Sequence, residues 1–134
     1  MRRIKLWIPS IIWAIFIFYL SNQPGSNLPK SGIFAVEGID RIGHFLEFFI
    51  FALLAAYGIE NDRKNLGLLK KIWFLILISS LYALSDEVHQ IPISERFFDI
   101  IDLIVDISGV VTFVIIYIFV KLAKGFKISK GLSN

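Results

Sequence analysis

The chain contains no cysteine among its 134 residues, and only 19% of those residues are charged. The absence of cysteine excludes a disulfide-linked scaffold, a thiolate nucleophile and a cysteine-ligated zinc site. The shortage of charge excludes an ordinary soluble domain of this size, because small domains need many polar residues to cover their surface. Ordinary globular proteins carry roughly 25% charged residues. A hydrophobic content of 56% also excludes a disordered chain, which leaves a small integral membrane protein.

Long apolar segments carry most of that hydrophobic content. A helix needs about 20 mostly apolar residues to cross a bilayer. The sequence therefore predicts four transmembrane helices, at about residues 4–20, 39–59, 72–90 and 98–120. The first is long and no small-x-small cleavage site follows it, so we interpret it as a retained anchor rather than a signal peptide. Because the sequence contains no internal repeat, we expect a single all-α domain over residues 1–134. This domain would be a four-helix transmembrane bundle.

The basic residues indicate an orientation, because excess Lys and Arg mark the cytoplasmic side of a membrane. Eleven of the 14 lie at the N-terminus, between the second and third helices, or in the C-terminal tail: Arg2, Arg3, Lys5, Arg63, Lys64, Lys70, Lys71, Lys121, Lys124, Lys127 and Lys130. Both termini are therefore predicted to be cytoplasmic, in the cell membrane. The bilayer is the expected partner of the basic tail, whose charges suit anionic headgroups. No nucleic-acid partner is predicted.

The acidic residues follow the opposite distribution. Nine of the eleven fall in the outer halves of the last three helices or in the outer loops: Glu37, Asp40, Glu47, Asp86, Glu87, Glu95, Asp99, Asp102 and Asp106. Both histidines, His44 and His89, accompany them. Since the second and fourth helices descend from outside and the third ascends towards it, we expect three polar half-helices to meet at one depth.

Within each helix the polar residues share a face at about 100° per residue. The three stripes are Asp40, His44 and Glu47; then Ser79, Tyr82, Asp86, His89 and Gln90; then Asp99, Asp102, Asp106 and Gly109. Ionisable groups that face lipid are costly, so each stripe should face the bundle interior or a water-filled cleft.

The innermost groups carry an excess of negative charge. They are His44, Glu47, Asp86, His89, Asp102 and Asp106. Their four carboxylates face only Arg41 and Arg96, which leaves two formal negative charges if both imidazoles are neutral. The carboxylates could hold protons, the histidines could become charged, or a cation could bind. The sequence does not choose among these, but each indicates a functional site.

The same residues admit several kinds of chemistry. Imidazole and carboxylate groups suit zinc or manganese, so all six innermost groups are candidate ligands of a divalent metal, although no His-Glu-x-x-His motif is present. General acid/base catalysis is about equally plausible, by His44, His89, Asp86 and Asp106. The alternative is a hydrogen-bonded network that only holds the helices in register. Arg41 and Arg96 suit a phosphate or carboxylate headgroup, or else ordinary ion pairs.

Four segments of the chain resemble the VanZ-like family of small bacterial membrane proteins. They are Ser21-Asn22-Gln23-Pro24-Gly25-Ser26, the run from Asp40 to Phe48, the run from Tyr82 to Gln90, and Arg96 followed by the run from Asp102 to Gly109. The family is linked to low-level resistance to the glycopeptide teicoplanin. The resemblance implies functional roles for Asp40, Arg41, His44, Asp86, Glu87, His89, Gln90, Arg96, Asp102 and Asp106. This chain departs from the family around Arg96, where bulky and acidic residues replace a Gly- and Ser-rich run.

Two functions follow as hypotheses. In the first, an outward-facing cleft binds a lipid-linked anionic cell-envelope compound or the lipid tail of a glycopeptide. Its ligand-binding residues would be Asp40, Arg41, Glu47, Glu87, Gln90, Arg96 and Asp102. In the second, the protein is an intramembrane hydrolase or transferase, with or without a metal, that acts on a lipid headgroup. A proton-coupled carrier is less favoured, because the apolar cytoplasmic halves offer no continuous polar path.

Overall fold

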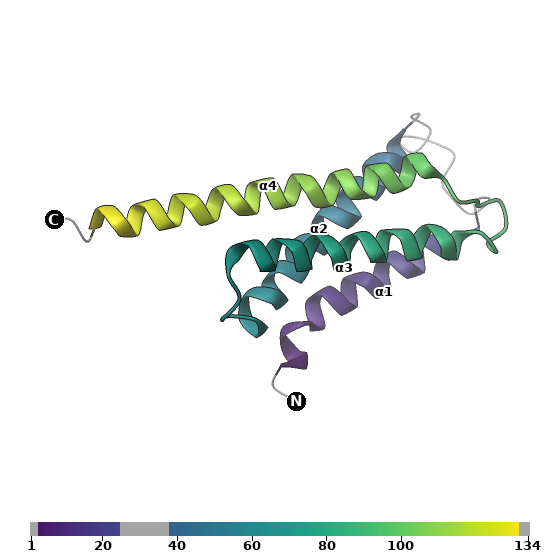
Figure 1. Cartoon of the computed structure of the whole chain (residues 1–134). Helices are drawn as coiled ribbons and strands as arrows, with labels where there is room; N and C mark the ends of the chain where they lie inside the picture. The colour runs from purple at the N-terminus through teal and green to yellow at the C-terminus, as the bar shows by residue number, and fades with distance from the viewer. Residues whose placement is uncertain (1–2, 25–37, 132–134) are drawn as a thin grey trace.

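The computed structural model describes residues 3–24 and 38–131, with side chains described as far as Lys124. A 3-10 turn, η1 (Ile4–Leu6), leads into four α-helices: α1 (Ile8–Ser21), α2 (Ile39–Asp62), α3 (Leu68–Gln90) and α4 (Ile100–Gly131). No strand occurs in the described part of the chain. Figure 1 shows the helices side by side, with α4 extending beyond the others towards the C-terminus. The predicted all-α, four-helix fold is confirmed.

The helix ends differ from the predicted ones, most of them by two to four residues and the end of the fourth helix by eleven. The first segment is interrupted at Trp7, and Pro9 lies in the first turn of α1, where its missing N–H does least harm. The third helix begins at Leu68 instead of 72, and the fourth continues to Gly131 instead of 120. The hydropathy of a segment shows where the apolar residues end, but not where the helix ends. Lysine, leucine and alanine are good helix formers, so the helices continue beyond that point.

Three of the helices are long and apolar enough to cross a membrane: α2, α3 and α4 up to Lys124. Helix α1 has 14 residues, shorter than the roughly 20 that a full crossing needs. Large apolar side chains such as Ile15, Trp73 and Phe119 are exposed on the helix surfaces. A bilayer is the environment that would cover such faces. The crossing of the first segment therefore stays a prediction.

The core lies mainly between α2 and α4, where Phe48, Ala52, Val110 and Phe113 are buried. The two backbones approach closely at Gly109. A Cβ atom there would lie 3.1 Å from the backbone nitrogen of Phe49 and would collide with the carbonyl oxygen of Phe45. Small residues permit such close approach between membrane helices. This contact fixes the register of α4 against α2. It therefore also fixes where Asp106, one turn before Gly109, lies along α2.

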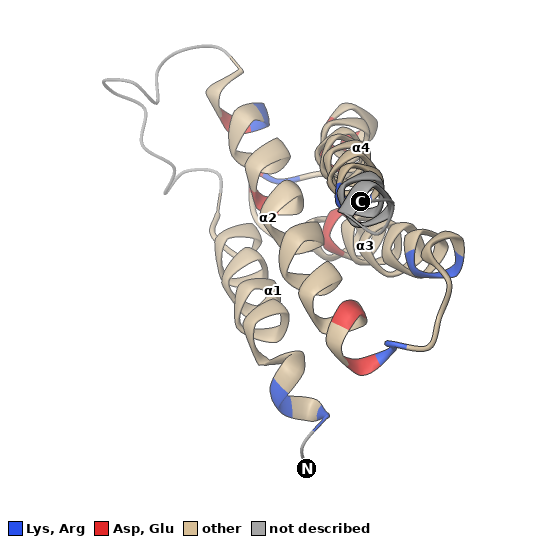
Figure 2. Ribbon diagram, turned by 90° about the vertical axis from the view of Figure 1, so that its left-hand side faces the viewer, with Lys and Arg blue, Asp and Glu red and all other residues tan. Residues whose placement is uncertain are grey.

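Basic residues gather at the end of the bundle where the N-terminus and the connection between α2 and α3 lie (Figure 2). Glu60 connects the helices at this end. Its two carboxylate oxygens lie 2.9 Å from Lys71 Nζ and 2.7 Å from Lys121 Nζ. The Tyr117 hydroxyl donates a further hydrogen bond to Glu60. Glu60 thus connects α2 with both α3 and α4. The Trp7 ring lies against Gly58 at the same end, which brings the start of α1 to α2.

We expect Gly109→Ala to lower the free energy of unfolding by about 1–3 kcal/mol, the usual cost of forcing extra volume into a packed interface. Gly43→Ala is the matched control, because a Cβ at Gly43 meets nothing within 4 Å among the described residues. Equilibrium unfolding of both variants in mixed micelles measures the difference. Equal stability of the two variants would contradict the close approach at Gly109.

Candidate functional site

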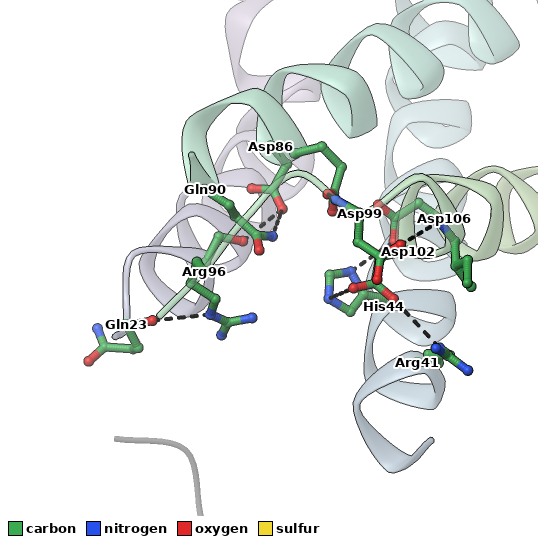
Figure 3. Close-up of polar contacts among 12 residues, drawn as sticks. Gln23, Arg41, His44, Asp86, Gln90, Arg96, Asp99, Asp102 and Asp106 are labelled. Atoms are coloured by element: carbon green, nitrogen blue, oxygen red, sulfur yellow. Dashed lines mark hydrogen bonds and ion pairs between the residues drawn. The ribbon is translucent and has the colours of Figure 1, made fainter. Parts of the chain in front are cut away.

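The polar half-helices meet at the end of the bundle opposite Glu60. The C-terminal ends of α1 and α3 and the N-terminal ends of α2 and α4 lie there together (Figure 1). Figure 3 shows side chains from these ends directed towards one another. Residues far apart in the sequence, such as His44 and Asp106, are therefore in contact. Two groups of contacts can be distinguished, one on each side of α3.

The first group connects α2 with α4 through His44. Its Nδ1 atom lies 3.1 Å from Asp106 Oδ1, and its Nε2 atom lies 4.0 Å from Asp102 Oδ2. Arg41 extends this group outward, with Nε 3.8 Å from Asp102 Oδ1. Asp106 is completely buried and His44 is 9% exposed, whereas the Arg41 side chain is about half exposed. The predicted residues on α2 and α4 thus form one chain of contacts from the core to the surface (Figure 3).

Glu87 brings α3 into this first group. Its carboxylate is completely buried, and Oε2 accepts a hydrogen bond of 3.0 Å from the backbone N–H of Asp99. His44, Glu87 and Asp106 each offer a potential ligand atom within 4.8 Å of those of the other two. The sequence stripe on α3 did not select Glu87 as a metal ligand. The sequence offers no signal that separates Glu87 from Asp86, since the two acids are adjacent and their directions depend on how the other helices pack around α3.

The second group connects α3 with α1 through Asp86. Ser21 Oγ donates a hydrogen bond of 2.7 Å to Asp86 Oδ2, and Gln90 Nε2 donates to the same oxygen at 3.4 Å. Asp86 is 3% exposed. Adjacent residues on a helix point about 100° apart, so Asp86 is directed towards α1 while Glu87 is directed towards α4. The two neighbouring acids therefore belong to different groups.

Further predicted residues lie on the α1 side. The His89 ring stacks on Phe18, with ring centroids 4.4 Å apart. Arg96 Nε donates a hydrogen bond of 3.3 Å to the carbonyl oxygen of Gln23 (Figure 3). Of the six candidate metal ligands, His44, Asp102 and Asp106 are brought together, whereas Asp86 and His89 contact α1. Glu37, Gly25 and Ser26 fall outside the described residues.

A cleft of about 340 Å³ opens between the C-terminal end of α1 and the N-terminal end of α2. Its walls combine apolar side chains with acids, an imidazole, amides and one guanidinium group: Leu20, Ser21, Gln23, Ile39, Asp40, Gly43, His44, Glu47, Gln90 and Arg96. Four of the candidate ligand-binding residues line it, namely Asp40, Glu47, Gln90 and Arg96. Arg41, Glu87 and Asp102 are not among the described residues that form its lining. His44 borders both the cleft and the first group of contacts.

The model of one protein family, described as VanZ/LLP1, matches residues 6–121. The match runs from Leu6, the last residue of η1, to Lys121 in α4, and it includes every residue of the two groups. No curated protein matches the chain. No solved structure matches it either.

We expect Ser21→Ala to lower the free energy of unfolding by about 1–2 kcal/mol, because it removes the shorter hydrogen bond to a buried carboxylate. Ser85→Ala is the matched control on α3. Its hydroxyl is exposed and bonds only to the carbonyl of Tyr82 in its own helix, so a change within about 0.5 kcal/mol is expected. Thermal unfolding in detergent compares the two. Equal losses would show that Ser21 does not hold α1 to α3.

Proposed function

The chain belongs to the VanZ-like family, and on that premise we propose that it binds a lipid-linked anionic compound of the cell envelope in its cleft. The observation that carries the proposal is the composition of the cleft. It joins apolar walls at Leu20 and Ile39 to the guanidinium group of Arg96. An amphipathic molecule with an anionic group needs both kinds of surface.

The proposal includes an orientation. The cleft would open to the outer leaflet, with both termini on the cytoplasmic side of the cell membrane. The basic residues Arg63, Lys70 and Lys71, which lie around the opposite ends of α2 and α3, support this direction. A ligand carried in the outer leaflet would then reach the cleft from the bilayer itself.

Each wall of the cleft has a role in this proposal. Arg96 uses Nε to hold the carbonyl of Gln23, so its terminal N–H groups are directed to a phosphate or carboxylate. Asp40 and Glu47 accept hydrogen bonds from hydroxyl or amide groups that flank the anionic group. Leu20 and Ile39 contact the lipid chain. Arg41 is paired with Asp102 outside the cleft lining, so it contributes less than Arg96.

The family's link to teicoplanin resistance adds a second ligand for the same cleft. The acyl chain of a lipoglycopeptide would lie against Leu20 and Ile39, as the chain of a lipid-linked precursor would. Binding of the drug at the outer leaflet, away from its target, would supply the resistance. The two ligands share an apolar chain next to a polar headgroup.

We expect Arg96→Ala to weaken the binding of a polyprenyl phosphate by about tenfold or more, because a hydrogen bond to a charged group is lost. Native mass spectrometry or ligand titration of the purified protein measures this. Arg63→Ala, at the other end of the bundle, should leave affinity unchanged. Arg41→Ala should have the smaller effect of the two outer arginines.

Two further ligands serve as comparisons in the same binding experiment. They are the uncharged polyprenol and the glycopeptide without its acyl chain. Weak binding of the polyprenol shows that the anionic group is recognised. Teicoplanin binding that disappears with its acyl chain assigns the drug to the same cleft. Equal binding of polyprenol and polyprenyl phosphate, or an Arg96→Ala variant of full affinity, would refute the proposal.

The contact between His44 and Asp106 favours a second candidate, an intramembrane hydrolase or transferase. A buried carboxylate that holds an imidazole by one nitrogen is the arrangement that orients a general base. His89 and Asp86, the other candidate catalytic residues, contact α1 and would act only on a ligand that reaches that side. In this candidate the anionic ligand of the cleft is the substrate.

If the protein is an enzyme, we expect product to form when polyprenyl phosphate is incubated with the wild-type protein. The Asp106→Asn variant should form no product but should still bind the polyprenyl phosphate. The base would lose the carboxylate that orients it. Liquid chromatography with mass spectrometry detects the product. The Arg63→Ala variant changes a residue at the other end of the bundle, so it serves as the control. A ligand that is bound unchanged by the wild type excludes this activity on it.

A further inference from the structure

Three buried side chains from three different helices converge beside the cleft. They are His44 of α2, Glu87 of α3 and Asp106 of α4, and one nitrogen or oxygen atom of each lies within 4.8 Å of the other two. Glu87 and Asp106 are both completely buried. Helices so far apart in the sequence place such groups together only when the packing of the whole bundle brings them there.

The two carboxylates have oxygen atoms without partners. Glu87 Oε1 and Asp106 Oδ2 are buried and have no hydrogen-bond partner within residues 3–24 and 38–131. Asp102 Oδ1, at the edge of the group, has none among the same residues. A buried polar atom without a partner is costly, and a carboxylate oxygen is among the costliest. Glu87 Oε1 and Asp106 Oδ2 therefore require a donor or a cation that the described chain does not supply, whereas Asp102 Oδ1 has Arg41 Nε at 3.8 Å.

The charges point to a cation. Glu87, Asp102 and Asp106 are three acids, and the basic groups in contact with them are Arg41 and the His44 imidazole. Arg41 is about half exposed, and within residues 3–24 and 38–131 the acid that it approaches is Asp102. The innermost pair, Glu87 and Asp106, thus has no fully charged partner among the described residues apart from a protonated His44. A divalent ion would neutralise both acids at once.

We propose that His44, Glu87 and Asp106 form a binding site for a divalent cation. One imidazole and two carboxylates suit Zn²⁺ or Mn²⁺ better than Ca²⁺ or Mg²⁺, which prefer oxygen ligands alone. The 3.1 Å between His44 Nδ1 and Asp106 Oδ1 is close to the roughly 3.4 Å that separates two ligands of a tetrahedral ion. Asp102, 4.0 Å from the other ring nitrogen, has the place of a residue that orients a metal-bound imidazole.

The test uses the full-length protein in detergent, treated with a chelator and then titrated with Zn²⁺ or Mn²⁺ alone. Calorimetry and elemental analysis after gel filtration give affinity and stoichiometry. We expect one ion per chain in the wild type. Glu87→Gln and Asp106→Asn should each weaken binding by at least about tenfold.

The chain offers a matched control for each ligand type. Asp86→Asn changes the adjacent buried acid, which faces Ser21 on α1, and should keep the ion. His89→Gln changes the histidine that stacks on Phe18 and should also keep it, whereas His44→Gln should lose it. Circular dichroism and gel filtration establish that each compared variant is folded. Equal loss in a site variant and its control would overturn the assignment.

A measurement on the wild type alone tests the proposal even if the variants do not fold. X-ray absorption at the metal edge should show one imidazole among oxygen ligands. Two imidazoles would mean that His44 and His89 bind together, which would overturn the proposal. So would a wild-type protein that retains no stoichiometric ion of either metal. Because no lipid ligand is added, these outcomes are independent of whether the cleft binds a polyprenyl phosphate.

Discussion

The structure depends on one constraint: an acid buried among membrane helices must find its partner inside the protein, because lipid offers none. Asp86, Glu87 and Asp106 are nearly or completely buried. Their positions decide which faces of α3 and α4 turn inward. Apolar packing between helices gains little in a bilayer, since lipid chains are equally apolar, so polar contacts and close backbone approach specify the arrangement. In this protein the two occur side by side, with Gly109 one turn from Asp106.

Two adjacent acids of α3 connect it to different helices at the end of the bundle opposite Glu60. Asp86 holds α1 through Ser21, while Glu87 faces α4 through the backbone of Asp99. A single turn of α3 therefore contacts both neighbours. The cleft lies on the Asp86 side, and His44 borders both the cleft and the first group of contacts. A ligand in the cleft would touch the imidazole whose other contacts are Asp102 and Asp106. The His44 side chain thus lies between the cleft and the acids Asp102 and Asp106.

Much of this arrangement could be predicted from the sequence, and the rest could not, for physical reasons. The length of the apolar segments was sufficient to predict four helices, but not the ends, since helix formers such as Lys124 continue α4 past the apolar part. The polar half-helices correctly predicted where His44 and Asp106 lie. Which of two adjacent acids faces which helix depends on how α1 and α4 pack around α3. The stripe of polar residues on a single helix does not contain that information. Glu87, which faces α4, and His89, which contacts α1, are the clearest examples.

Glu60 has a consequence for how the molecule can move. It holds α2, α3 and α4 together at one end, through Lys71, Lys121 and Tyr117. The polar groups and the cleft are at the other end. The bundle is thus held at both ends, by ion pairs around Glu60 at one and by the hydrogen bonds of Asp86 and Asp106 at the other. A guest too large for the cleft would have to break hydrogen bonds at the second end, while the ion pairs around Glu60 stayed in place.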